Sequence, residues 1–597
     1  MSEFTPDPKL EQPEVDTGKK TWFTRFLDFV EWMGNLLPHP VTLFALFAIG
    51  VVLLSGVADW LGWSAADPRP EGAPGRAPDG IIEPVSLLNG DGLRRIIENL
   101  VRNFTNFAPL GVVLVALLGV GVAEKSGLIS AVIRGLVLKA ASYKPLKRDS
   151  GFRVQTFNSD LIILRVLGMI LIPFRFLFYL IMIPLRRPIN FILTPKNLVT
   201  IAICFAAVVS NTASEMGYVV LVPLAAVIFY SMGRHPLAGL ACAFACVSGG
   251  YSANLLIGTI DPLLAGLTQE AANIIDPGYE VHAAVNYYFM FISTFLITAV
   301  GSFVTLKIVE PKLGKYDPSI AMEDLSEESN MDPLTSDEVS GLKWTAVTVL
   351  AMLAVLFLAV YPENGVLRNP DTGEILNSPL LRGVVALIFI GFLIPGYVFG
   401  RVAGTMKNDR DVIDGMAGAM ATLGLYIVIV FFAAQFVAYF GWTNLGQIFA
   451  VKGAEFLEYI GLTGPSVFIG FILVSGSVNL MLGSASAQWA VTAPIFVPML
   501  MLIGYSPEVI QAAYRIGDSV TNIITPMMSY FGLILAFANK YDRNLGIGTI
   551  ISMMLPYSIL FMIGWMILFY LWVFLLGMPV GPEAPTYYDI TQGLGGY

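Results

Sequence analysis

Four ionisable side chains lie within stretches of this 597-residue chain that are apolar enough to enter a lipid bilayer: Glu215, Asp261, Arg515 and Asp518. A charge at that depth costs at least about 2.5 kcal/mol, so each is a candidate for function. Asp261 has no basic neighbour in sequence and stands directly before Pro262, where it could bind a proton or contact a solute. Arg515 and Asp518 are three residues apart and share a helical face. They form either an internal ion pair or a direct contact with a solute.

Clusters of small polar residues interrupt the apolar segments around these charges. One interruption is residues 210–215 (SNTASE), and its counterpart in the other half of the chain is residues 484–489 (SASAQW). Each precedes a further broken segment, at residues 252–262 and 521–526. Unwound backbone and Asn, Ser or Thr side chains are costly in hydrocarbon unless they line a cavity. Close helix packing is the alternative for any single small residue, but four symmetric interruptions favour a binding site at the junction of two repeats.

The residues at these interruptions form the candidate site. Trp489 offers an aromatic face beside a polar cluster, on which an aromatic solute could stack. Pro507 and Pro526 end or break helices and shape the cavity. The candidate substrate- or ion-binding residues are Asn211, Asn254, Asp261, Ser486, Trp489, Arg515, Asp518 and Asn522.

Composition limits the class of protein. The chain is 55% hydrophobic and only 13% charged, whereas soluble domains average roughly 25% charged residues. The net charge of -9 comes mostly from the N-terminal tail and one linker, and no basic stripe suggests nucleic acid. No histidine stands beside a nucleophile or a metal-ligand cluster, and no phosphate-binding loop pattern occurs. These features argue against an enzyme and against an ATP-driven pump.

The hydrophobic pattern predicts an all-α integral membrane protein with about nine transmembrane helices and two opposed re-entrant hairpins. Clusters of Lys and Arg put the N-terminus in the cytoplasm and the C-terminus outside. We expect the hairpins at residues 198–233 and 468–504. The crossings are expected at residues 40–60, 108–123, 287–306, 344–361, 381–398, 423–439 and 551–576, with two broken helices at residues 235–268 and 507–537.

Polar segments divide the chain. One region, residues 142–195, carries Arg165 and Arg175 in an otherwise apolar run. A single crossing there would invert everything downstream, so we interpret it as an interfacial or re-entrant insertion. The expected units are a disordered cytoplasmic tail (1–20), a first membrane half (21–316), an acidic cytoplasmic linker (317–342), a second membrane half (343–577) and an external tail (578–597).

The two halves predict an inverted repeat, because the first hairpin enters from the inside and the second from the outside. Its pseudo-two-fold axis would bring both hairpin tips and both broken helices near the midplane of the membrane. Exposed helix N-termini there attract anions, while carbonyl, Asn, Ser and Thr oxygens suit a small cation. The pairs expected to correspond are Asn211 with Ser486, Pro223 with Pro498, and Asn254 with Asn522.

Long motifs in these segments resemble the AbgT family, the p-aminobenzoyl-glutamate transporters of bacterial inner membranes. The resemblance covers nearly the whole chain outside the tail and the 142–195 insertion, where the family has a short basic loop. It implies a homodimer of nine-span protomers, and functional roles for Asp261, Ser486, Trp489, Pro507, Arg515, Asp518 and Pro526. The motifs that carry it are residues 30–48, 103–129, 210–229, 233–269, 483–501 and 507–537.

The resemblance and the residues together predict a secondary active transporter for aromatic carboxylates of the p-aminobenzoyl-glutamate and p-aminobenzoate type, coupled to an ion gradient, with H⁺ favoured over Na⁺. Export of sulfonamide antimetabolites, as by an antiporter, is a further activity that the resemblance implies. We expect Arg515 to pair with the carboxylate, Trp489 to stack on the ring and Asp261 to carry a proton.

The alternative is a Na⁺-coupled dicarboxylate importer, because Ser210, Asn211 and Thr212 resemble the signature of a broader ion-transporter superfamily. Na⁺ at these three residues is the one cofactor considered.

Overall fold

A computed structural model describes the protein over most of its length. The N-terminal tail and the residues that follow it up to 37, nearly all of the 142–195 insertion and the middle of the acidic linker lie outside the described residues, as does Glu215. The described residues are 38, 40–73, 76–141, 194–213, 217–322, 334–375, 378–543 and 545–590.

The first half of the chain is helical, with one small exception in an extramembrane loop. There a two-residue pair of antiparallel strands, β1 (Ala65–Ala66) and β2 (Ile81–Ile82), joins Ala65 to Ile82. The helices are α2 (Pro40–Trp60), α3 (Gly90–Thr105), α4 (Ala108–Ser126), α5 (Leu128–Ala141), α7 (Pro195–Ser210), α8 (Val222–Ser231), α9 (Pro236–Ser248), α10 (Ile260–Ala272), α11 (Tyr287–Val304) and α12 (Glu310–Leu313), with short 3₁₀ or π turns at η1 (Asn211–Ala213), η2 (Gly217–Leu221), η3 (Thr305–Val309) and η4 (Pro318–Ile320).

The second half repeats the alternation of long and broken helices. Its elements are α13 (Ser336–Val360), α14 (Pro379–Arg382), α15 (Val384–Ala403), α16 (Asp409–Thr422), α17 (Gly424–Trp442), α18 (Leu445–Tyr459), α19 (Val467–Leu482), α20 (Ala485–Leu502), α21 (Pro507–Asn522), α22 (Phe531–Tyr541), α23 (Ile547–Phe569) and the π turn η5 (Tyr570–Leu575).

Within the described ranges, eight helical stretches are long and apolar enough to cross a membrane. They include seven of the predicted crossings, with the second lengthened to Gly90–Ser126, and also Ala485–Leu502, which is one arm of a predicted hairpin. The two predicted broken helices fall short of the length because each is split, into α9 and α10 and into α21 and α22. A multi-span helical protein is therefore present, while the count of nine crossings and the re-entrant course of the hairpins stay predictions.

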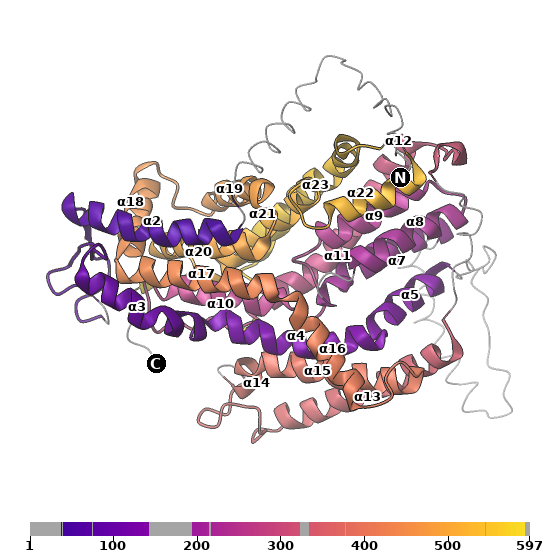
Figure 1. The fold of residues 1–597 in the computed structure, drawn as a ribbon, viewed down its shortest axis with the longest axis horizontal. Helices are drawn as coiled ribbons and strands as arrows, with labels where there is room; N and C mark the ends of the chain where they lie inside the picture. Colours follow the sequence, from indigo (N-terminus) through magenta and orange to yellow (C-terminus); the bar gives the residue numbers. More distant parts are fainter. Residues whose placement is uncertain are drawn as a thin grey trace, which may run out of the picture.

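Burial separates a central group of helices from a peripheral one. Only 6% of the most apolar stretch of α13 is buried inside the protein, against 67% for α20. Figure 1 shows α13, α14, α15 and α16 along one edge of the molecule, while α10, α17 and α20 lie side by side toward its left end. Every residue of α9 and α21 is buried, so these two segments of the broken helices are surrounded by protein, as interrupted backbone in a membrane requires.

Candidate functional site

Helix α21 carries two of the predicted site residues through the middle of the protein. Ser506 precedes it, and its hydroxyl accepts a hydrogen bond from the amide of Val509 at 3.3 Å. Pro507 occupies the first turn of the helix, where its missing backbone N–H breaks no hydrogen bond within the helix. Every residue of α21 is buried. The cap and the proline therefore fix where the helix begins, and both Arg515 and Asp518 lie buried within it.

Arg515 pairs with Asp261, across 254 residues of sequence. Its Nη2 donates to Asp261 Oδ1 at 2.6 Å, and the two side chains are 4% and 2% exposed. Asp261 lies in the first turn of α10, where its Oδ2 accepts a hydrogen bond from the amide of Gly258 at 2.6 Å. The structure thus joins the two broken helices through one buried ion pair.

The guanidinium of Arg515 is only partly satisfied by this contact. Its Nε and Nη1 are buried and have no hydrogen-bond partner among the residues that the structure describes. An ion pair between Arg515 and Asp518, one of the two alternatives left by the sequence, is absent from that part of the chain, and Asp518 Oδ1 is likewise buried without a partner. The sequence suggested this neighbour because it lies three residues away, but the partner comes from another helix.

Trp489 lies fully buried, with one face already covered. Its ring stacks on Tyr514 at 4.2 Å between centroids and an interplanar angle of 23°. Its Nε1 donates to Thr268 Oγ1 at 2.9 Å, which ties α20 to α10. The expected stacking of an aromatic solute on Trp489 would have to use its other face.

A small cavity of about 140 Å³ lies beside the second hairpin tip. Ser486 lines it, as predicted for a residue of that tip, and so do two tyrosines that the sequence interpretation missed. Tyr218 and Tyr530 stack with centroids 4.8 Å apart and rings tilted by only 2°. Tyrosines in apolar segments resemble membrane-interface anchors, so only the fold reveals that these two face each other. The lining residues are Tyr218, Tyr251, Ile260, Gly483, Ser484, Ala485, Ser486, Asn522, Met528, Ser529 and Tyr530.

The tip of the first predicted hairpin, at residues 210–213, is hydrogen-bonded to the broken helix that follows it. Asn211 Nδ2 donates to the carbonyls of Val247 and Gly250, at 2.9 and 3.2 Å. Thr212 Oγ1 donates to Asn254 Oδ1 at 2.6 Å. In the predicted Na⁺ set, the Ser210 hydroxyl donates to a carbonyl of its own helix and keeps its acceptor lone pairs. Asn211 Oδ1 is buried and has no partner in the described ranges, so it is a further acceptor that could face a cation.

The second tip contains a residue that the sequence interpretation overlooked. Asn479 Nδ2 donates to the Asp518 carbonyl at 2.9 Å, to Thr521 Oγ1 at 3.0 Å and to Asn522 Oδ1 at 2.8 Å. Asn479, not Ser486, therefore makes the contact equivalent to that of Asn211, and the expected correspondence of Asn211 with Ser486 is wrong. An isolated Asn within the apolar residues 467–482 was the available signal.

Buried acceptors without a partner gather around this second tip. Asn479 Oδ1, Gln488 Oε1 and Asp518 Oδ1 are all buried, and none has a hydrogen-bond partner among the described residues. Gln488 is anchored by its Nε2, which donates to the Ser475 carbonyl at 2.7 Å. Pro526 lies in the break between α21 and α22. Oxygen atoms left unpaired in a protein interior are costly unless something binds them.

Comparisons with known proteins agree on one family. The family model described as "AbgT putative transporter family" matches residues 25–145 and 180–588. The unmatched residues 146–179 fall within the predicted 142–195 insertion. The p-aminobenzoyl-glutamate transport protein of Escherichia coli (strain K12) is 33% identical over 554 residues, which are 93% of this chain and 95% of that protein.

Two solved structures of transport proteins are similar to this chain along their whole length. The structure of Neisseria gonorrhoeae MtrF, which represents a class of antimetabolite efflux pumps, is 54% identical, with a TM-score of 0.80 over 94% of this chain and 100% of that one. The Alcanivorax borkumensis YdaH transporter is 41% identical, with a TM-score of 0.75 over 91% of this chain and 100% of that one. The protein is a membrane protein of the AbgT transporter family.

Proposed function

We propose that this protein is an ion-coupled secondary transporter of aromatic carboxylates of the p-aminobenzoyl-glutamate and p-aminobenzoate type. The observation that carries the proposal is the buried pair of Arg515 and Asp261, which links the two broken helices and leaves two guanidinium nitrogens without a partner among the described residues. Arginine binds carboxylates through two parallel hydrogen bonds. A family relative in E. coli is a p-aminobenzoyl-glutamate transport protein, and this substrate carries the carboxylates that such a site would bind.

Protonation of Asp261 would couple substrate to ion. While Asp261 is ionised, the buried pair with Arg515 is neutral overall. A proton on Asp261 removes that anion and leaves a buried, uncompensated guanidinium, which is strongly unfavourable until another carboxylate takes its place. Substrate carboxylate and proton should therefore bind together, because each increases the affinity of the protein for the other.

The remaining predicted residues have supporting roles in this proposal. Ser486 and the Tyr218–Tyr530 stack line the cavity that would take the substrate ring. Since about 140 Å³ is less than the roughly 300 Å³ of a typical ligand pocket, the stack would separate as the substrate enters. Trp489 and Thr268 position α20 against α10. Asn211, Asn254 and Asn522 hold the two tips, and Pro507 and Pro526 set where the helices begin and break.

Na⁺ is the second candidate for the coupling ion. Carboxylate and amide oxygens suit a small hard cation. Asn479, Gln488 and Asp518 each have a buried oxygen near the second tip that finds no partner in the described part of the chain. At the first tip, Asn211 supplies one such oxygen from the predicted Ser210–Asn211–Thr212 set. We favour H⁺ because the Arg515–Asp261 pair explains coupling without a further ligand.

The surrounding architecture in this proposal is a homodimer in the bacterial inner membrane. Each protomer would have nine crossings and two opposed hairpins in an inverted repeat, with the N-terminus cytoplasmic and the C-terminus periplasmic. Export of sulfonamide antimetabolites is part of the proposal because MtrF represents a class of antimetabolite efflux pumps. A sulfonamide brings no carboxylate to replace ionised Asp261, so its export would proceed by exchange for a proton and not by the joint binding described for carboxylates. A dicarboxylate importer would need a second free cation at the site, whereas buried Arg234 already pairs with Glu310 at 2.9 Å.

Transport into membrane vesicles tests the proposal. Labelled p-aminobenzoate and p-aminobenzoyl-glutamate are offered with H⁺ and Na⁺ gradients imposed separately, using Asp261→Asn, Arg515→Ala and, as a matched control, exposed Asp59→Asn. We expect gradient-driven transport by the wild type and the control, and its loss in both site variants. Unchanged transport in Arg515→Ala would contradict the site, and no transport of either compound by the wild type would contradict the substrate class.

A further inference from the structure

A second and larger cavity lies at the opposite end of α10 from Asp261. It has a volume of about 440 Å³, within the roughly 300–1,000 Å³ that small-molecule sites span. Glu270 and Asn273 line it, nine or more residues along the chain from Asp261. At about 1.5 Å per helical residue, the two sites are separated by about 14 Å along α10. The larger cavity is therefore distinct from the one at the second hairpin tip.

Helices α3 and α17 face each other across this cavity, α3 with a row of polar side chains and α17 with a row of small ones. From α3 and its C-cap come Asn99, Arg102, Asn103 and Asn106, spaced so that they share one helical face. The facing stripe of α17 consists mainly of small residues between Ala434 and Gly441. Small side chains leave room where a helix–helix seam would otherwise be filled, and the polar stripe turns the remaining space into a hydrogen-bonding surface.

Hydrogen bonds link the helices that surround this cavity. Asn103 Nδ2 donates to Gln435 Oε1 at 2.8 Å, and Gln435 Nε2 donates to the Leu100 carbonyl at 2.9 Å. Farther along, Gln447 Nε2 donates to the Ile274 carbonyl at 2.9 Å, which fixes the end of α10 against α18. These bonds join α3, α10, α17 and α18 around the cavity, so its walls exist before any ligand arrives.

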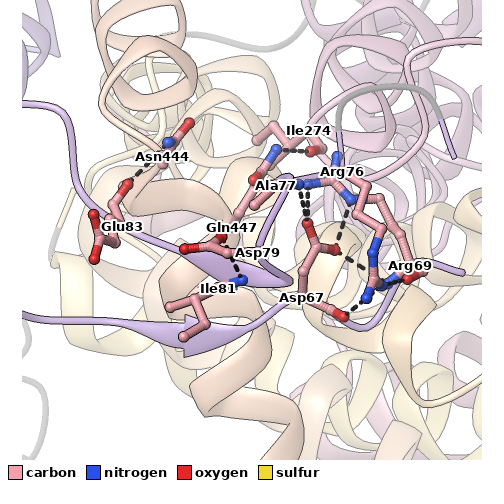
Figure 2. Close-up of polar contacts among 10 residues, drawn as sticks. All are labelled: Asp67, Arg69, Arg76, Ala77, Asp79, Ile81, Glu83, Ile274, Asn444 and Gln447. Atoms are coloured by element: carbon pink, nitrogen blue, oxygen red, sulfur yellow. Dashed lines mark hydrogen bonds and ion pairs between the residues drawn. The ribbon is translucent and has the colours of Figure 1, made fainter. Parts of the chain in front are cut away.

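The loop that carries β1 and β2 contacts the start of α18, as Figure 2 shows. Arg69 Nη2 donates to Gln447 Oε1 at 3.3 Å and pairs with buried Asp67 at 2.7 Å. Asn444, in a left-handed conformation with φ of 57°, donates from Nδ2 to the Glu83 carbonyl at 2.9 Å. A wall held at both ends loses little entropy on binding a ligand.

The charged and aromatic side chains that line the cavity indicate the chemical class of its ligand. Arg102 is exposed and forms no ion pair with any residue in the described part of the chain, so its guanidinium can take a carboxylate. Trp442 and Phe107 supply aromatic surface, and Arg95 already covers one face of Trp442 at 4.5 Å. Glu270 also lines the space, and a carboxylate can accept a hydrogen bond from an N–H donor on a ligand.

We propose that this cavity is a second binding site for aromatic carboxylates that also carry an amine or amide N–H. Arg102 binds the carboxylate, Asn99 and Asn273 bind carbonyl or N–H groups, Trp442 contacts the ring and Glu270 accepts from the amine. The identity of this ligand rests on the proposed function, because it is the same chemical class as the transported substrate.

Equilibrium binding of labelled p-aminobenzoyl-glutamate to the purified full-length protein, in nanodiscs of phosphatidylcholine, tests this inference. We expect two saturable classes of site per chain in the wild type. Arg515→Ala should abolish one class and keep the other. Arg102→Ala should keep the first and weaken the second by about tenfold or more, as expected on loss of a charge-assisted hydrogen bond. Arg94→Ala is the matched control, because this exposed arginine of α3 pairs with Asp91 and does not line the cavity.

The outcomes separate the two proposals. One class of site, lost in Arg515→Ala and unchanged in Arg102→Ala, overturns the second site and leaves the proposed function standing. No binding of the compound by the wild type overturns both. A second class that disappears when anionic lipid is added, and returns on its removal, would show that Arg102 takes a lipid headgroup and would also overturn the inference.

Discussion

Asn211 and Asn479 make the same hydrogen bond at matching points of the two halves. Each donates from Nδ2 to the carbonyl of the residue 39 positions further on, Gly250 at 3.2 Å and Asp518 at 2.9 Å. Each also has a buried Oδ1 with no partner among the described residues. One amide therefore clamps each hairpin arm to the broken helix that follows it, and holds one acceptor oxygen free in both places.

Removing either amide should loosen one clamp. We expect Asn479→Ala to lower the free energy of unfolding by about 1–3 kcal/mol, because it leaves the buried Asp518 carbonyl and the Thr521 hydroxyl with fewer partners. Asn211→Ala should behave alike. Thermal unfolding in detergent measures the effect. Ser477→Ala, on the exposed face of the same helix α19, is the control and should change the midpoint little. Equal shifts in Asn479→Ala and Ser477→Ala would contradict the clamp.

The buried pair of Arg515 and Asp261 should couple strongly in stability. Truncating one partner leaves an uncompensated charge and should cost about 3–5 kcal/mol, while the double variant Asp261→Ala with Arg515→Ala should cost much less than the sum. A double-mutant cycle by denaturant unfolding measures this coupling. The same cycle on Lys452 and Glu455, about half exposed at 2.9 Å, is the control, with a coupling of about 1 kcal/mol or less. Additive effects at Arg515 and Asp261 would show that the pair is not formed.

The sequence could predict local features of the site but not the contacts between distant helices. The breaks in α9–α10 and α21–α22 were predictable because Gly, Asn and Pro interrupt apolar runs locally. Asp261 and Arg515 were each recognisable as charges at membrane depth. Their pairing was not, because it depends on how two broken helices pack, and a helical spacing of three residues pointed to Asp518 instead.

The sequence matched the two halves of the chain to each other, and this match was misaligned in detail. Matching polar runs by composition paired Asn211 with Ser486, whereas a clamp depends on position along a helix arm, and that position belongs to Asn479. The pairing of Asn254 with Asn522 is compatible with the new alignment, since Asn254 contacts Thr212 at the first tip and Asn522 contacts Asn479 at the second.

Packing between α19 and α21 requires a glycine at position 517. A Cβ there would overlap the Ile472 carbonyl and lie 2.7 Å from the Ser475 Cβ. Gly517→Ala should therefore force the two helices apart and cost more than about 1 kcal/mol, as overpacking does. Gly391→Ala is the matched control, because that glycine of α15 has open space at its Cβ. It should raise stability by up to about 1 kcal/mol through helix propensity. Thermal midpoints of the two variants should move in opposite directions, and parallel shifts would contradict the close approach.

The Asp67 carboxylate should make the β1–β2 loop sensitive to acid. Burial by itself raises the pKa of Asp67, but hydrogen bonds from the Arg69 side chain and the Ala77 amide, helped by the charge of Arg69, outweigh it and lower the pKa below its ordinary value. A lowered carboxyl pKa contributes stability that is present above the unfolded pKa of about 4 and lost as pH falls through the folded pKa.

Amide exchange across residues 65–82, corrected for intrinsic rates, should therefore show protection at pH 5 that declines toward pH 3. Asp67→Asn should be poorly protected at both pH values. Asp79→Asn should resemble the wild type, because the Asp79 carboxylate is exposed and accepts a local hydrogen bond from the Ile81 amide. Protection that stays constant to pH 3 in the wild type would show that the loop does not depend on this charge.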